Sequence, residues 1–239
     1  MLKPARLNFE LLFSVGASLF GLLTISMLAL YPPTNPPVFS LRKPIVGLVF
    51  GIICVSGILA AVYPTKCLGA FEHQKISGPA MSTNSDRSAQ LGNAVKGHHF
   101  DCERYSAHTI KIKEQTLCAA CTGLSLGAMF ALVGGIPYFL VGWQIQQSSL
   151  IVASGQLGVL LGFIQFKFAG LMRLALNAVF VLGAYFMLIG IDMLARNVFI
   201  DFYLILLIIL WIWTRILLSR WDHVNTCRTC KLQCKLKER

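Results

Sequence analysis

Charged side chains are scarce in this sequence. Only 13% of its 239 residues are Asp, Glu, Lys or Arg, whereas 56% are hydrophobic. A soluble globular domain has about 25% charged residues, so this chain has too few polar side chains to cover its surface in water. The composition excludes a soluble globule and favours an integral membrane protein.

Two further absences narrow the class of membrane protein. The apolar runs lack the alternation of apolar and polar residues that the strands of a membrane barrel require. No internal repeat is evident, and few polar residues besides Gln156 fall at mid-membrane depth, which weakens a transporter. Because helices satisfy their backbone hydrogen bonds within each segment, the sequence predicts an all-α, polytopic membrane fold.

Six apolar runs are predicted to span the membrane, because about 20 apolar residues cross the hydrocarbon. They cover residues 9–31, 44–63, 117–141, 148–166, 170–194 and 198–218, and the fourth is the shortest. The spans define a first transmembrane hairpin, a loop, a four-helix transmembrane segment and a basic Cys-rich tail. These parts are residues 1–63, 64–116, 117–218 and 219–239, and the loop divides into a flexible part (64–97) and a Cys/His-rich part (98–116).

The distribution of Lys and Arg predicts the orientation. Six spans place both termini on one side, where seventeen basic residues fall, against three on the other side, Arg42, Lys43 and Arg196. By the positive-inside rule the N and C termini, the loop and the tail are predicted to be cytoplasmic, in a multi-pass protein of the cell membrane. Arg215 falls in the last turn of the sixth run, where its side chain is expected to snorkel to the interface.

The formal net charge of +11 then describes a basic cytoplasmic face. Such a face attracts the anionic headgroups of membrane lipids, which are the predicted partners. No aromatic and basic surface motif accompanies the charge, so nucleic acid is not a predicted partner.

Six of the eight cysteines lie in two clusters beside predicted spans. The clusters read Cys102-x15-Cys118-x2-Cys121 and Cys227-x2-Cys230-x3-Cys234. A Cys-x2-Cys pair supplies two thiolate donors from one turn, which tetrahedral zinc sites and iron-sulfur sites both use. The other two cysteines, Cys54 and Cys67, are interpreted as inert thiols.

Histidines near both clusters favour one or two cytoplasmic metal sites. In the loop the predicted fourth ligand is His108, with His98 and His99 as alternatives, and in the tail it is His223. Imidazole ligands favour zinc, and an iron-sulfur cluster is the less favoured alternative. A protein with such sites is interpreted as a structural or accessory component or a small-molecule carrier rather than an enzyme.

A thiol-disulfide oxidoreductase is the alternative function. Cys118 and Cys121 fall at the start of an apolar run, and the partial positive charge of a helix N terminus lowers a thiol pKa. Membrane enzymes that make disulfides exchange with their substrates outside the cytoplasm, so the predicted orientation argues against that particular role.

The segment from Cys102-Glu-Arg-Tyr-Ser106 to Leu117-Cys-Ala-Ala-Cys-Thr-Gly123 resembles a group of small membrane proteins. It is similar to the family catalogued as domain of unknown function 2085, whose core is a Cys, a nearby Arg-Ser and a Cys-x2-Cys-Thr-Gly that opens a membrane helix. The resemblance covers about residues 98–130. It implies a shared cysteine site but no reaction, and Glu103 stands where the family has a His.

Other residues within the runs predict how the helices pack. Pairs of glycines four residues apart indicate close helix approach; they are Gly47-x3-Gly51, Gly123-x3-Gly127 and Gly158-x3-Gly162. Gln156 is predicted to bond one helix to another. Asp192 and Asp201 flank the turn between the last two runs and are expected to be solvated at the interface.

Overall fold

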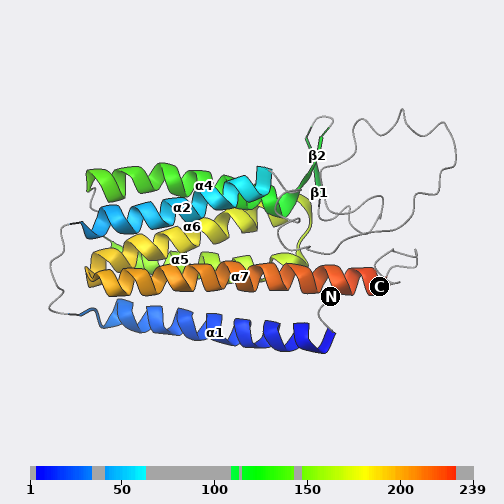
Figure 1. The fold of residues 1–239 in the computed structure, drawn as a ribbon, viewed down its shortest axis with the longest axis horizontal. Helices are drawn as coiled ribbons and strands as arrows, with labels where there is room; N and C mark the ends of the chain where they lie inside the picture. Colours follow the sequence, from blue (N-terminus) through cyan, green and yellow to red (C-terminus); the bar gives the residue numbers. More distant parts are fainter. Residues whose placement is uncertain (1–3, 34–40, 63–108, 113–114, 143–146, 230–239) are drawn as a thin grey trace, which may run out of the picture.

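The computed structural model describes residues 4–33, 41–62, 109–112, 115–142 and 147–229. Within them, six α-helices run alternately up and down in an elongated bundle (Figure 1). They are α1 (Pro4–Leu30), α2 (Arg42–Val62), α4 (Ala119–Ile136), α5 (Ser148–Phe163), α6 (Gly170–Ala195) and α7 (Val198–Thr229). The first residues of α1 and the last residues of α7 lie at the same end of the bundle.

Five of these helices are long and apolar enough to cross a membrane, which confirms the predicted all-α, polytopic fold. The exception is α5, which corresponds to the shortest predicted run. It ends at Phe163, and the chain continues through a short 3-10 helix, η4 (Gln165–Lys167), so the apolar helix is shorter than expected.

Two short elements adjoin α4 at its two ends. An antiparallel hairpin of β1 (Thr109–Ile112) and β2 (Gln115–Cys118) leads directly into its first turn, and the register places Thr109 opposite Cys118. At the other end, α4 widens into a π-helix, η3 (Pro137–Val141). Pro137 lacks the N–H that an α-helical hydrogen bond requires, which accounts for the change in helix type at this residue.

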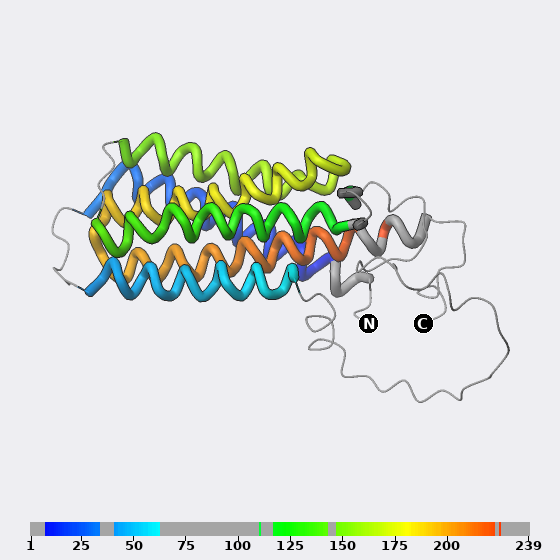
Figure 2. The backbone as a smooth tube through the Cα atoms, turned by 90° about the horizontal axis from the view of Figure 1, so that it is seen from above, coloured from blue at the N-terminus to red at the C-terminus, as the bar shows by residue number. Residues whose placement is uncertain are grey.

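Helix α6 forms the centre of the bundle. It packs against α4 and α5, while α2 lies on α4 and α1 lies on α7 (Figures 1 and 2). Of its most apolar stretch, 61% is buried inside the protein, against 17% for α2. Most of this stretch of α6 is therefore shielded from lipid by neighbouring helices.

Glycines bring α4 and α5 into close contact with α6. A Cβ atom at Gly183 would lie 2.6 Å from the carbonyl oxygen of Gly155, and one at Gly127 would lie 2.7 Å from the carbonyl oxygen of Ala178. Such contacts leave no room for a side chain, so the helices meet backbone to backbone. This agrees with the close approach that the glycine pairs in α4 and α5 predict.

Polar side chains join α1 to its neighbours. The amide nitrogen of Gln156 donates hydrogen bonds to the carbonyl oxygen of Leu22 (3.1 Å) and to the hydroxyl of Ser26 (2.9 Å), which confirms its predicted role between helices. The buried hydroxyls of Ser18 and Thr214 are 2.8 Å apart and tie α1 to α7.

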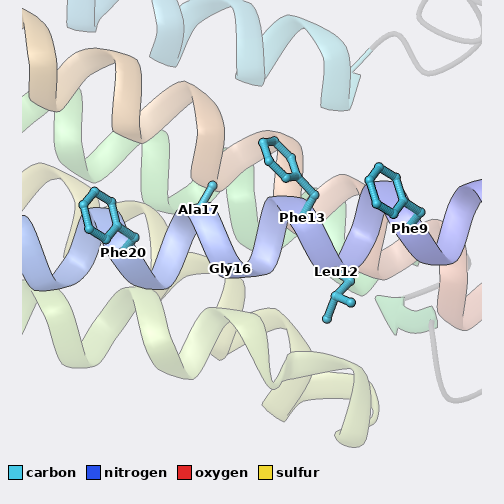
Figure 3. Close-up of a pocket in the computed structure, with 6 residues that line it drawn as sticks. All are labelled: Phe9, Leu12, Phe13, Gly16, Ala17 and Phe20. Carbon is cyan, nitrogen blue, oxygen red and sulfur yellow. The ribbon is translucent and has the colours of Figure 1, made fainter.

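The outer face of α1 carries large apolar side chains that no other helix covers in the described structure. Phe9, Leu12 and Phe13 are 70%, 74% and 69% exposed, and with Phe20 they border a shallow hollow along the helix (Figure 3). In a membrane this face contacts lipid. Its lining offers no polar side chain that would fix a ligand, so it is not a candidate site.

We expect Gly183→Val to destabilise the bundle, because the new side chain would overlap the backbone of α5 at Gly155 and Gly158. Overpacking of this kind typically costs about 1–3 kcal/mol. The thermal midpoint of the detergent-purified protein should fall. Gly57→Val is the matched control, since a Cβ atom at Gly57 meets nothing within 4 Å, and an equal loss in both variants would contradict the close packing of α5 on α6.

Candidate functional site

The thiols of Cys118 and Cys121 lie at the junction between the hairpin and α4. Cys118 ends β2 in an extended conformation and is the N-cap residue of α4, while Cys121 lies in the first turn. Cys118 and Cys121 are not joined in a disulfide, and both residues are partly buried. The predicted position of the pair at a helix N terminus is therefore confirmed, and the pair lies at the end of the bundle that holds the last residues of α7 (Figure 1).

The pKa of Cys118 is lowered to about 5. The largest cause is a hydrogen bond from the thiol of Cys121, and the backbone N–H groups of Cys121 and Ala120 lower the pKa further. Burial acts in the opposite direction, and the positive charge of Arg215 adds a smaller lowering effect. Because these donors stabilise the anion, Cys118 is a thiolate at neutral pH.

Arg215 extends from α7, where its side chain is buried, and its positive charge acts on Cys118. Its guanidinium donates two hydrogen bonds to the side-chain oxygen of Asn177, from Nε (3.0 Å) and from Nη2 (2.7 Å). Asn177 in turn donates from its amide nitrogen to the carbonyl oxygen of Arg173 (2.6 Å). The sequence-based prediction that Arg215 snorkels to the interface is wrong, because the guanidinium is buried and is bonded to Asn177 inside the bundle.

A second arginine, Arg173, lies in the same region and is 2% exposed. Its Nη2 donates to the carboxylate of Asp222 on α7 at 3.4 Å, so this contact links α6 to α7. Together with Arg215 and the thiolate of Cys118, these groups comprise two cations and two anions. The balance matters because an uncompensated charge inside a protein costs several kcal/mol.

The glycine after the cysteines holds the thiol pair against these polar residues. A Cβ atom at Gly123 would lie 2.2 Å from the carbonyl oxygen of Leu174 and 2.8 Å from Cβ of Asn177. The first turn of α4 therefore rests directly on the turn of α6 that carries Arg173 and Asn177. In addition, the hydroxyl of Thr122 donates to the carbonyl oxygen of Cys118 (2.9 Å), which closes the first turn.

The side chains of the other predicted metal ligands lie outside the described part of the structure. Cys102, His98, His99, His108, Cys230 and Cys234 lie outside the described residues, as does Cys67. Helix α7 continues through His223 and Cys227, whose side chains also lie outside the description. Among the described residues no group of three or more His, Cys, Asp or Glu could hold a metal ion, so the zinc sites stay a prediction. Cys54 is buried in α2, apart from both clusters.

The expected solvation of Asp192 and Asp201 is wrong. Both carboxylates are 0% exposed, because Arg42 from the start of α2 donates hydrogen bonds to each of them. The partner that removes them from water is far away in the sequence, and hydropathy along one run gives no indication of it.

Sequence reasoning also missed Asn177 and Asp222 as partners of the two arginines. A signal was available for Asn177, since it follows Arg173 by one helical turn within an apolar run, and polar residues at such positions face the interior of a bundle. Asp222 gives no comparable signal, because it lies beyond the last apolar run.

Comparison with known proteins adds no relative. No family model, no curated protein and no solved structure matches the chain. What the site can do must therefore be argued from its own chemistry, and the resemblance at residues 98–130 stays a prediction.

We expect Cys121→Ala to raise the pKa of Cys118 toward its ordinary value, because the variant removes the largest stabilising hydrogen bond. Cys121→Ser should raise it less, since a hydroxyl can still donate. Arg215→Gln should also have a smaller effect, because the charge of Arg215 lowers the pKa of Cys118 less than the hydrogen bonds do. The rate of Cys118 alkylation against pH, followed by mass spectrometry, measures all three variants, and unchanged profiles in all of them would contradict the assigned causes.

Proposed function

We propose that this multi-pass membrane protein carries out thiol-disulfide exchange, with the thiolate of Cys118 as nucleophile and Cys121 as the resolving thiol. The observation that carries the proposal is the position of both thiols at the first turn of α4, where Cys121 is the main cause that lowers the pKa of Cys118 to about 5. A thiolate is the attacking form in disulfide exchange, and a second thiol in contact with it can complete the reaction.

The exchange proceeds in two balanced steps. The Cys118 thiolate attacks one sulfur of a substrate disulfide, forms a mixed disulfide and releases the other substrate sulfur as a thiolate. Cys121 then loses its proton and attacks the sulfur of Cys118, which releases the second substrate thiolate and leaves a Cys118–Cys121 disulfide. A cellular thiol such as a glutathione-type reductant returns the pair to the dithiol, so two electrons pass from that reductant to the substrate.

The surroundings of the pair favour its reduced form. Forming the disulfide would remove the thiolate and leave Arg215 with one fewer anion beside it. Stabilisation of a reduced thiolate raises the reduction potential of a dithiol pair. The pair therefore rests as a dithiol, and its substrate is a disulfide of still higher potential, as strained or exposed disulfides are.

The orientation predicted from the basic residues is compatible with this direction of exchange. A cytoplasmic thiol pair is kept reduced by its compartment, and disulfides formed there are transient and either catalytic or redox-sensing. Unlike a membrane enzyme that makes disulfides outside the cytoplasm, an enzyme that reduces them can exchange with its substrates inside it.

Trapping of the mixed disulfide tests this function. In cells that express Cys121→Ser, an adduct through Cys118 should accumulate, because the resolving thiol is absent while a hydroxyl donor remains. After acid quenching and thiol blocking, the adduct should appear as a band that reductant removes. It should be missing in Cys118→Ser and in the double variant, and Cys54→Ser should behave as the unmodified protein. An adduct band of equal intensity in all variants would contradict the proposal.

Metal ligation is a second candidate that one observation favours. Thr109 pairs with Cys118 across the hairpin, and His108 is the residue directly before Thr109 in the sequence. The predicted ligand His108 is therefore covalently bonded to the residue that pairs with Cys118. With Cys102 and Cys121, these residues would supply the zinc site that the spacing predicts, and the metal would stabilise a loop too short to bury a core.

Metal content separates the two candidates. If Cys118 works in exchange, protein purified without chelators should hold no near-stoichiometric zinc or iron that Cys118→Ser removes. Near-stoichiometric zinc that is lost in Cys118→Ser but kept in Cys54→Ser would favour the metal site and overturn the exchange proposal. Parallel measurement of Cys230→Ser shows whether the loop and the tail share one ion.

A further inference from the structure

A second buried polar cluster lies at the end of the bundle opposite the thiols. It comprises Arg42 at the start of α2, Tyr138 in η3, Asp192 near the end of α6 and Asp201 near the start of α7. The two carboxylates are 0% exposed. None of these residues takes part in the thiol chemistry, and burial of this kind needs a reason because ionisable groups in membrane segments are energetically expensive.

The two carboxylates differ in how many of their oxygens accept hydrogen bonds. Asp192 accepts at both oxygens, from Nη1 of Arg42 at Oδ1 and from the hydroxyl of Tyr138 at Oδ2. Asp201 accepts only at Oδ2, again from Nη1 of Arg42, at 2.7 Å. Its Oδ1 is buried and has no hydrogen-bond partner within the described part of the chain.

The cluster also has fewer cationic groups than carboxyl groups. One guanidinium serves two carboxylates, so the cluster would hold a net negative charge if both were ionised. The ammonium of Lys43 lies 4.5 Å from the centre of the Tyr138 ring, where it is partly exposed to solvent and bonds to neither carboxylate in the described structure. The backbone N–H of Arg196, in the turn between α6 and α7, donates to the backbone carbonyl oxygen of Asp192 at 3.1 Å.

We propose that Asp201 binds an exchangeable proton at Oδ1, which makes this cluster a buried proton-binding site. With that proton in place, the remaining charges are the guanidinium of Arg42 and the carboxylate of Asp192, which balance each other. Asp192 accepts hydrogen bonds at both oxygens, and hydrogen bonding to the charged form of a carboxyl group stabilises that form.

The N terminus of α7 opposes protonation of Asp201, but its effect is too small to remove the proposed proton. Asp201 lies in the first turn of α7, where the partial positive charge of the helix N terminus weakly favours a carboxylate. Burial of a carboxylate oxygen that accepts no hydrogen bond, next to a second carboxylate, disfavours the charged form more strongly. The proton is therefore retained.

Release of the proton would change the packing at this end of the bundle. It would place two negative charges at the same nitrogen, Nη1, of one guanidinium where α2, α6 and η3 meet α7. Water would have to enter to solvate the second charge, so protonation of Asp201 is coupled to closure of these four elements around the cluster.

Infrared spectroscopy of the purified full-length protein in lipid nanodiscs tests the proposal. At neutral pH the unmodified protein should show the carbonyl stretch of a protonated carboxyl group, shifted in heavy water. Asp201→Asn should remove the band, and Asp222→Asn, a matched change at the other end of the bundle, should retain it. Absence of the band in the unmodified protein, or its persistence in Asp201→Asn, would overturn the proposal.

The thermal midpoints of the same proteins provide a second readout. Asp201→Asn replaces a neutral group with a neutral group of the same shape and should leave the midpoint close to that of the unmodified protein. Asp192→Asn removes the anion that balances Arg42 and should lower the midpoint. A larger loss in Asp201→Asn than in Asp192→Asn would show that Asp201 carries the charge and would contradict the assignment.

Discussion

Buried charge is the constraint on which this bundle depends. Arg173 and Arg215 at one end, and Asp192 and Asp201 at the other, are withdrawn from water in a chain that has few charged residues. An ion inside a membrane protein is tolerated only when an opposite charge or a set of hydrogen bonds compensates it, because desolvation otherwise costs several kcal/mol. The helices must therefore meet in the register that brings these partners together.

Helices α6 and α7 supply most of these partners. Helix α6 carries Arg173 and Asn177 near its start and Asp192 near its end, while α7 carries Asp201 and Arg215. The two polar clusters are thus joined by one pair of helices, and the glycine contacts pack α4 and α5 on α6. Because both clusters share these elements, the chemistry at either end rests on the same packing.

The fold class could be predicted from the sequence because the property that decides it is local. A continuous apolar run of sufficient length indicates a membrane helix whatever its neighbours are, and only α5 is shorter than its run suggests. The position of Cys118 and Cys121 at a helix start is local in the same way. Gln156 was also identified correctly, since a polar residue deep within an apolar run must face another helix.

The partners of the buried charges could not be predicted, because they depend on which sides of distant helices face each other. Arg42 and Asp192 are 150 residues apart in the chain, and Arg215 and Asn177 are 38 apart. Hydropathy gives the approximate depth of a residue in the membrane but not its direction around the helix axis. The burial of Asp192 and of Arg215 follows from that direction, and both therefore appeared to be interfacial residues.

The central claim is that the bundle keeps Cys118 as a thiolate beside the buried Arg215. The most direct test is the ultraviolet absorbance of the thiolate against pH, in reduced protein that retains Cys118 and Cys121 and has serine at the other six of its eight cysteines. We expect one thiolate at neutral pH, with a midpoint at a pH of about 5. A thiolate that forms only near the ordinary cysteine pKa of about 8.5 would contradict the claim.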